Sequence, residues 1–157
     1  MEGQRSSLVL CLGPKGSGKT LLCKGLHFAH SNGGAWSLGE MPLHQPTLGS
    51  GLTAFRFGKR GSVDLRELGG EMQAIWSDYY EETDAVLFVV DSASPFSPAI
   101  SSLLLQQCLQ HPKLIGKPFL VAFTKTDIIG ALTVTTSAYS LQNVPNIIAW
   151  LSERLQA

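Results

Sequence analysis

The chain has 157 residues, with 12 lysines and arginines against 12 aspartates and glutamates, so its formal net charge is zero. Hydrophobic residues make up 44% and charged residues 15%, a balance that is typical of a globular protein and excludes a disordered one. The length predicts a single domain over residues 1–157, and the even charge argues against nucleic acid or an anionic membrane surface as a partner.

Apolar runs of strand length alternate with helical patterns along the chain. The strand-like runs cover residues 7–13, 52–57, 62–68, 84–91, 118–125 and 132–137. The helical patterns cover residues 19–30, 97–110 and 146–156. Several of the strand-like runs are apolar almost throughout, as strands covered on both faces are. The alternation therefore predicts an α/β fold, with a mostly parallel sheet of six strands and helices on both faces.

Two of the helical patterns carry local signals. The first places Leu22, Leu26 and Ala29 on one face of a helix. In the second, Ser97 is the expected N-cap, and Pro98 is the expected first helical residue because proline lacks the N–H that a first turn leaves unpaired.

A glycine-rich loop joins the first strand to the first helix. Its sequence, "GPKGSGKT", has the pattern G-x-x-x-x-G-K-[ST] in the strand–loop–helix context that this motif requires. Glycines let backbone N–H groups point at phosphate oxygens, and the helix N-terminus adds its dipole. Lys19 is expected to reach the β- and γ-phosphates, and Thr20 to ligate Mg²⁺. The expected nucleotide-binding residues of this loop are Gly13, Lys15, Gly16, Ser17, Gly18, Lys19 and Thr20.

Two later motifs have the order expected of sensors of the γ-phosphate. The stretch "QPTLGSG" places Thr47 just before the second strand, and "RELGG" places Gly69 and Gly70 at the end of the third. With these residues the chain resembles the ADP-ribosylation-factor-like small GTPases, whose first switch reads P-T-x-G and whose second switch follows a double glycine. The tryptophan and tyrosine that come next in that family are matched within "IWSDYY", and "LFVVDSAS" is similar to its strand-end motif.

The resemblance implies the three-layer fold of the P-loop NTPases and a regulatory switch that binds GTP and GDP with Mg²⁺. In such a switch Thr47 ligates Mg²⁺ and senses the γ-phosphate, which the Gly70 amide also contacts. Loss of that phosphate then releases both loops. The resemblance further implies effector proteins in intracellular trafficking, an exchange factor and a GTPase-activating protein as partners.

Three residues depart from the pattern of that family. Glu67 stands in place of the usual aspartate that binds Mg²⁺ through water, and it is one methylene longer. Glu71 replaces the glutamine that orients the attacking water, and a carboxylate is unfavourable beside a developing phosphoryl anion. We therefore expect slow intrinsic hydrolysis, with Glu71 and Gly70 as the catalytic positions. Lys15 occupies a position that is usually small or acidic; it either adds a cation near the γ-phosphate or points into solvent, which long lysines favour.

The guanine-reading loop of that family is N-K-x-D, which here becomes "TKTD" at residues 124–127. The resemblance implies that the two oxygens of Asp127 accept hydrogen bonds from the guanine N1–H and amine, a donor pair that adenine lacks. Lys125 is expected to lie along the base and ribose. Thr124 lacks the amide that ties the loops together in the family, but its hydroxyl can keep one bond.

The second base-reading loop of the family is matched by Ser137 and Ala138, whose amide is expected to meet guanine O6. Only residues 128–131 lie between Asp127 and the strand-like run at 132–137, which leads to this second loop. A parallel crossover needs about a dozen residues and usually a helix. The helix before the last strand is thus missing. Either a tight link reaches this strand, or the strand does not join the sheet in parallel, or the base site is damaged. We expect a nucleotide affinity below that of a typical relative.

Three functions remain open: the GTP-binding switch, a pseudo-GTPase that serves as a binding module, and a P-loop enzyme that uses ATP. Glu71 and the short base region favour the second, while the scattered arginines and Asp127 argue against the third. We expect a cytoplasmic monomer without a direct membrane anchor. The first residues do not read as a signal peptide, Glu2 excludes myristoylation, and no apolar run has the length of a membrane span.

Overall fold

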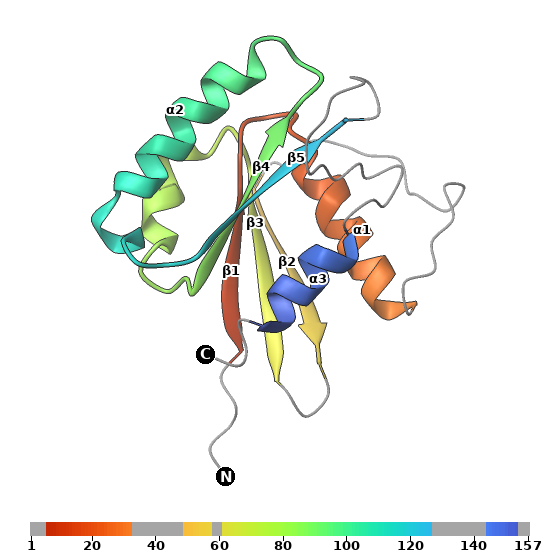
Figure 1. Ribbon diagram of the computed structural model, residues 1–157. Coiled ribbons are helices and arrows are strands. Elements are labelled where there is room, and N and C mark those ends of the chain that lie inside the picture. The colour runs from red at the N-terminus through yellow and green to blue at the C-terminus, as the bar shows by residue number, and fades with distance from the viewer. Residues whose placement is uncertain (1–5, 33–48, 58–60, 127–143, 154–157) are drawn as a thin grey trace.

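The computed structural model describes residues 6–32, 49–57, 61–126 and 144–153. In this part of the chain a central sheet has helices on both faces (Figure 1). The strands are β1 (Ser7–Leu12), β2 (Ser50–Arg56), β3 (Ser62–Leu68), β4 (Ala85–Asp91) and β5 (Phe119–Thr124). The helices are α1 (Lys19–Ser31), α2 (Ser97–Gln110) and α3 (Val144–Glu153), with short 3-10 helices η3 (Gln73–Tyr79) and η4 (Pro112–Leu114). The predicted three-layer α/β fold is confirmed; the sixth strand expected at 132–137 lies outside the described residues.

The described strands form one five-stranded sheet in the order β2-β3-β1-β4-β5. Only β2 and β3 pair antiparallel, while β1 pairs parallel with β3 and β4, and β4 pairs parallel with β5. The chain leaves β1 toward β3 on one side and later returns to β4 on the other, so the loop after β1 lies at a topological switch point. The loops after β1, β3, β4 and β5 therefore meet at one edge of the sheet, where α/β folds bind their ligands.

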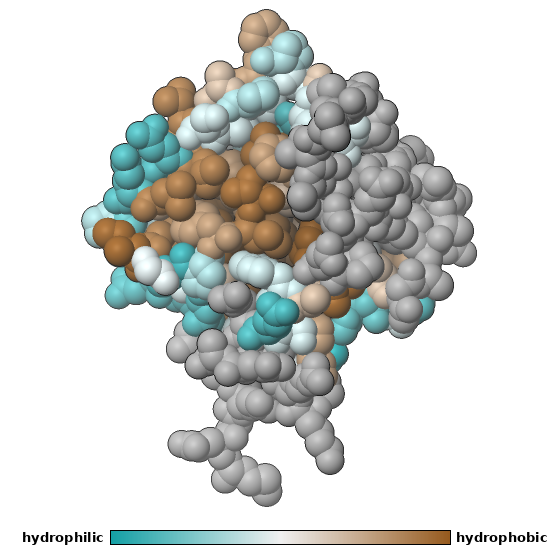
Figure 2. All heavy atoms as spheres, in the orientation of Figure 1, coloured by the Kyte–Doolittle hydropathy of each residue, from teal (hydrophilic) through white to brown (hydrophobic). Residues whose placement is uncertain are grey.

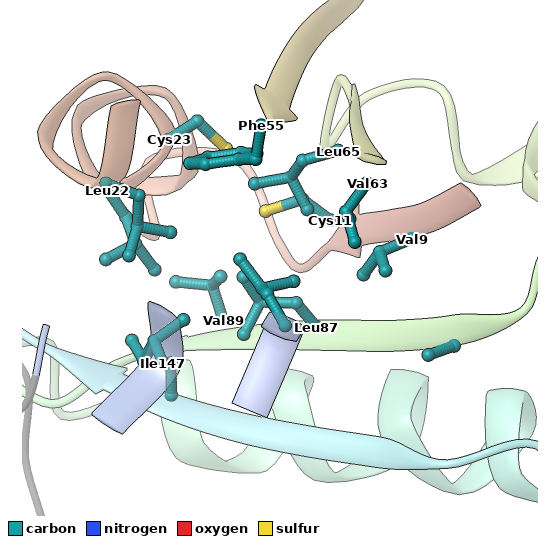
Figure 3. Packing of buried hydrophobic residues seen from close by; sticks show 14 of the residues in the cluster. Val9, Cys11, Leu22, Cys23, Phe55, Val63, Leu65, Leu87, Val89 and Ile147 are labelled. Atoms are coloured by element: carbon teal, nitrogen blue, oxygen red, sulfur yellow. The ribbon is translucent and has the colours of Figure 1, made fainter. Parts of the chain in front are cut away.

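Alternation along the strands divides the core into two layers. Residues such as Val9 and Cys11 of β1 face α1 and α3, whereas Leu10 and Leu12 face α2 and η3. Figure 3 shows the first layer, with side chains from α1, the strands and α3 pointing toward one another. The predicted face of α1 is buried, with Leu22, Leu26 and Ala29 each at most 3% exposed. The interior strand β4 is buried along its whole length, which explains its continuous apolar run.

All three cysteines are buried and free. Cys11 on β1 and Cys23 on α1 belong to the same core layer, as expected of small hydrophobic residues (Figure 3). A hydrogen bond between these two thiols, together with burial, raises the pKa of Cys23 well above its ordinary value. Cys108 on α2 lies in the other layer, where its Sγ is 3.4 Å from the Tyr80 hydroxyl. The cysteines thus act as packing residues.

The start of α2 differs from the prediction. Phe96, and not Ser97, is the N-cap, and its side chain makes no capping hydrogen bond. The Ser97 amide donates to the Ser94 carbonyl at 3.3 Å, so a turn leads into helical geometry one residue early. The Ser97 hydroxyl instead meets the Ser101 hydroxyl at 3.4 Å. Helix ends often differ by a residue, but here the serine also has a different partner.

The outer side of α2 is also partly apolar. Ile100, Leu103 and Leu109 are half or more exposed, although other residues of the same helix, such as Leu104 and Cys108, are buried in the core. In Figure 2 the upper left of the molecule, where α2 lies, is mainly hydrophilic with single apolar side chains between, and a larger apolar group lies below it. The helix therefore has apolar residues on two faces, one toward the sheet and one toward solvent.

Candidate functional site

The loop between β1 and α1 has a conformation that depends on glycine. Gly13, Gly16 and Gly18 have φ angles of 149°, 76° and 87°, a region that other residues rarely adopt. A Cβ atom on Gly13 would lie 2.3 Å from the carbonyl oxygen of Val89 on β4, so no side chain fits there. Gly18 is the N-cap of α1. The loop thus brings backbone N–H groups to a helix N-terminus, an arrangement that favours a bound phosphate.

The side chain of Lys19 folds back into this loop and is buried. Its Nζ donates hydrogen bonds to the carbonyl oxygens of Gly13 at 2.9 Å and Pro14 at 2.8 Å, and Ser17 Oγ lies 3.5 Å away. Burial lowers the pKa of Lys19, while the neighbouring thiols and the Glu67 carboxylate act in the opposite direction. A phosphate at the loop would stabilise the charged form, because an anion nearby raises the pKa of an amine.

Glu67 lies beside the loop because β3 pairs with β1. The register places Glu67 opposite Cys11, shortly before the loop begins. The Glu67 side chain is buried, and its Oε1 accepts a hydrogen bond from the Thr20 hydroxyl. A hydroxyl and a carboxylate thus meet at the start of α1, and both supply the oxygen ligands that Mg²⁺ prefers.

The double glycine after β3 lies directly against the phosphate loop. A Cβ atom on Gly70 would lie 2.2 Å from the Lys15 nitrogen and 2.5 Å from the Pro14 carbonyl carbon, so only glycine permits this approach. On the other side, the indole Nε1 of buried Trp76 donates to the Gly69 carbonyl oxygen at 3.2 Å. The tryptophan of η3 therefore holds the double glycine in position.

An ion pair links the phosphate loop to the residue after the double glycine. Lys15 Nζ lies 2.5 Å from Glu71 Oε1, and the two side chains are 62% and 55% exposed. The expected solvent exposure of Lys15 is found, but its amine is paired with Glu71, which the sequence did not predict. Lys15 thus connects the two segments expected to surround the γ-phosphate.

The end of β5 is tied to the same loop. The Thr124 hydroxyl lies 2.5 Å from the Ser17 carbonyl oxygen, to which it donates, and 3.1 Å from the Val90 carbonyl oxygen on β4. Lys125 has a left-handed backbone, with φ 58°, and its Nζ donates to the Gly16 carbonyl oxygen at 2.9 Å and to Asp91 Oδ2 at 2.6 Å. These two side chains connect the base-reading segment to the phosphate loop.

A comparison of the sequence with models of protein families shows to which family the chain belongs. The family model described as the ADP-ribosylation factor family matches residues 1–154. The chain belongs to the ADP-ribosylation factor family. Membership of this family of small GTPases supports a GTP-binding regulatory role.

Relatives within the ADP-ribosylation factor family match most of the chain. The stretches "RELGG", "IWSDYY" and "AWL" resemble the member numbered sixteen, and the chain is 35% identical to ADP-ribosylation factor-like protein 16 of Homo sapiens over 98% of its own length and 76% of that protein. It is 33% identical to ADP-ribosylation factor-like protein 1 of Caenorhabditis elegans, covering 85% of this chain and 69% of the relative.

A solved structure of the family has the same fold. The Arl6 BBS3 small GTPase from Trypanosoma brucei, with the bound nucleotide analogue GppNp, superposes with a TM-score of 0.75. The match covers 97% of this chain and 98% of that one at 22% sequence identity. At this identity the likeness shows the shared fold alone.

The structure gathers most of the predicted site residues of this Arf-family chain at the loop edge of the sheet. The residues placed there are Gly13, Lys15, Gly16, Ser17, Gly18, Lys19, Thr20, Glu67, Gly70, Glu71, Thr124 and Lys125. Thr47, Asp127, Ser137 and Ala138 lie outside the described residues. Within the described ranges, no helix combines the length and apolar character needed to cross a membrane.

Asp91 is a member of the site that sequence reasoning missed. It ends β4, where the register pairs it with Thr124 of β5. Its Oδ2 binds Lys125, and its Oδ1 accepts from the Ala93 amide at 2.9 Å. A carboxylate at the end of an otherwise apolar strand is the signal in the sequence, because such a group rarely stays buried without a partner.

Proposed function

We propose that the chain is a GTP/GDP-binding regulatory switch with slow intrinsic GTP hydrolysis, formed by one domain over residues 1–157. The observation that carries this proposal is the close packing of Gly70 on the phosphate loop beside buried Lys19. The switch acts as a cytoplasmic monomer that recruits effector proteins in intracellular trafficking, controlled by an exchange factor and a GTPase-activating protein. Family membership supports the GTP-binding role and does not favour the pseudo-GTPase alternative.

The phosphates bind to the loop between β1 and α1. The backbone N–H groups from Lys15 to Thr20 face the phosphate oxygens, and the dipole of α1 adds to their attraction. Lys19 supplies the positive charge, held in place by its bonds to the loop carbonyls. The cost of burying this ammonium, visible in its lowered pKa, is offset when a phosphate anion lies next to it.

Thr20 and Thr47 would hold Mg²⁺ directly, and Glu67 would hold it through water. The donor set fits this ion, because Thr20 and Glu67 already place a hydroxyl and a carboxylate together. Mg²⁺ usually retains several waters and takes phosphate oxygens as further ligands, so two or three protein oxygens suffice. The chemistry that bound Mg²⁺ supplies is neutralisation of charge on the β- and γ-phosphates.

The guanine base of the nucleotide binds to the segment that follows β5. Asp127 recognises guanine, Lys125 supports the base and ribose, and the second base loop, Ser137 and Ala138, meets guanine O6. The ties from Thr124 and Lys125 to the phosphate loop support this placement, because they fix the start of the base-reading segment beside the phosphates.

Hydrolysis is slow because Glu71 takes the place of the glutamine that orients water. A carboxylate cannot donate a hydrogen bond to the γ-phosphate and opposes the charge that develops there. We expect Glu71→Gln to raise the single-turnover rate of GTP hydrolysis about tenfold. Glu81→Gln, which changes another exposed glutamate of an ion pair, is the matched control. An unchanged rate in Glu71→Gln would show that this residue does not limit hydrolysis.

A titration with labelled GTP, GDP and ATP, with and without Mg²⁺, tests the proposal as a whole. A guanine-nucleotide switch binds GTP and GDP far more tightly than ATP, and Mg²⁺ strengthens its hold on GTP. A preference for ATP would indicate an ATP-using P-loop enzyme instead. Failure to bind any of the three nucleotides would indicate a pseudo-GTPase.

A further inference from the structure

The ion pair between Lys15 and Glu71 joins the two segments that meet the γ-phosphate in the proposed function. Lys15 belongs to the phosphate loop, and Glu71 directly follows the double glycine after β3. Their charged atoms lie 2.5 Å apart. Gly70 packs on the backbone of Lys15 itself, so both side chains start from the point of closest contact between the two segments.

The two lysines of the loop differ in how firmly they are held. Lys19 is buried, and its amine is bound to two loop carbonyls. Lys15 is 62% exposed and Glu71 55%, so water competes with their ion pair and the partners separate at little cost. Lys19 is therefore a fixed cation, and Lys15 is a cation that can change its partner.

A γ-phosphate would compete directly with Glu71 for Lys15. GTP brings an additional anionic group to this end of the loop, which GDP does not, and that group attracts the Lys15 amine while it repels the Glu71 carboxylate. We infer that Lys15 changes partner with the nucleotide state, binding Glu71 in the GDP form and the γ-phosphate in the GTP form. The inference rests on the proposed function and deepens it, since it makes Lys15 and Glu71 residues that determine selectivity for triphosphate over diphosphate.

The exchange also carries a signal to the surface beside η3. Gln73 Nε2 donates to the Gly70 carbonyl oxygen at 3.0 Å, and Trp76 holds Gly69, so η3 stays attached to the double glycine. Glu71 lies between these anchors on an exposed turn. When Lys15 releases it, its negative charge moves while the anchors remain, and the surface next to η3 differs between the GTP and GDP forms.

The dissociation constants of GDP and of the slowly hydrolysed analogue GTPγS, measured by calorimetry with Mg²⁺ on the full chain, test this exchange. Lys15→Ala should raise the dissociation constant of GTPγS about tenfold more than that of GDP, because only GTPγS loses a charge-assisted contact. Glu71→Gln should lower the ratio of the GTPγS dissociation constant to the GDP dissociation constant about threefold, because a carboxylate that repels the γ-phosphate is removed.

Lys113→Ala is the matched control. Lys113 forms an exposed ion pair with Glu81 at 3.2 Å. Glu81 precedes β4 and Lys113 precedes β5, so the pair lies at the ends of these strands that are opposite to the phosphate loop. Its removal should leave the GTPγS-to-GDP ratio unchanged. A ratio that is unchanged in Lys15→Ala as well would overturn the inference while leaving the proposed function intact, because both nucleotides would still bind. If the unsubstituted chain binds neither nucleotide, the proposed function and the inference fail together.

Discussion

The phosphate end and the base end of the site are stabilised by different kinds of contact. At the phosphate end, backbone packs on backbone, with Gly13 against β4 and Gly70 against the loop, and the Lys19 amine adds bonds to the loop carbonyls. At the base end, within the described residues, side chains reach across to the loop, namely the Thr124 hydroxyl and the Lys125 amine. The first kind of contact leaves no room for another atom, whereas the second can be lost one hydrogen bond at a time.

This difference predicts how the two ends respond to substitution. A Cβ atom added at Gly13 or Gly70 would lie 2–3 Å from backbone atoms. A strand or a loop would have to move to make room for it, so such a substitution alters the whole phosphate end. A hydrogen bond from a side chain contributes about 1 kcal/mol, and its loss leaves the backbone where it was. Substitutions should therefore have large effects at the phosphate end and graded effects at the base end.

The largest effect is expected from Lys19→Ala. The substitution removes the buried charge that faces the phosphates and should weaken GTP binding by about 3 kcal/mol, as the loss of charge-assisted bonds to phosphate does. Calorimetric titration with GTP measures this loss. Lys24→Ala, an exposed lysine on the same helix, is the control and should bind GTP like the unsubstituted chain. Equal affinities in the two variants would contradict the role of the loop.

A smaller effect, on stability as well as on binding, is expected from Gly70→Ala. The new methyl group would lie 2.2 Å from the Lys15 nitrogen, so the segment after β3 must move away from the loop. We expect a loss of about 2 kcal/mol in the free energy of unfolding, measured by urea denaturation. Gly51→Ala adds the same methyl group where the nearest atom is 3.9 Å away, an ordinary contact. If both variants lose the same stability, the close packing at Gly70 is not what makes the phosphate end rigid.

The phosphate end is also the part that the sequence predicts best, for a physical reason. Apart from Gly70, its residues are contiguous, from Gly13 to Thr20, and the strand, turn and helix that place them are local structures. Asp91 and Lys125 are 34 positions apart, and only the register of β4 and β5 brings them together. No local pattern contains that register, so the sequence predicted Lys125 as a base residue without its partner.

The Lys15–Glu71 pair shows the same limit in another form. Each residue by itself departs from the pattern of the family, yet the two lie 56 positions apart and meet because Gly70 packs on the loop. From the sequence alone, solvent and a phosphate are the two possible surroundings of Lys15, since a neighbouring segment of the fold is not visible from the residue itself. Opposite charges at two unusual positions were the signal, and the parallel pairing of β1 with β3 decides that they meet.

The smallest expected effect belongs to the base end and tests the comparison most directly. Thr124→Val keeps the shape of the side chain, which lies beside Gly18, but removes the donor to the Ser17 carbonyl oxygen. We expect a loss of about 1 kcal/mol in the free energy of unfolding and only a slight loss of GTP affinity. Thr124→Ser keeps the hydroxyl and removes the methyl group, so it should retain most of that stability. If serine is as harmful as valine, packing of the Thr124 methyl group and not the hydrogen bond ties β5 to the loop, and the two ends of the site are then stabilised in the same way.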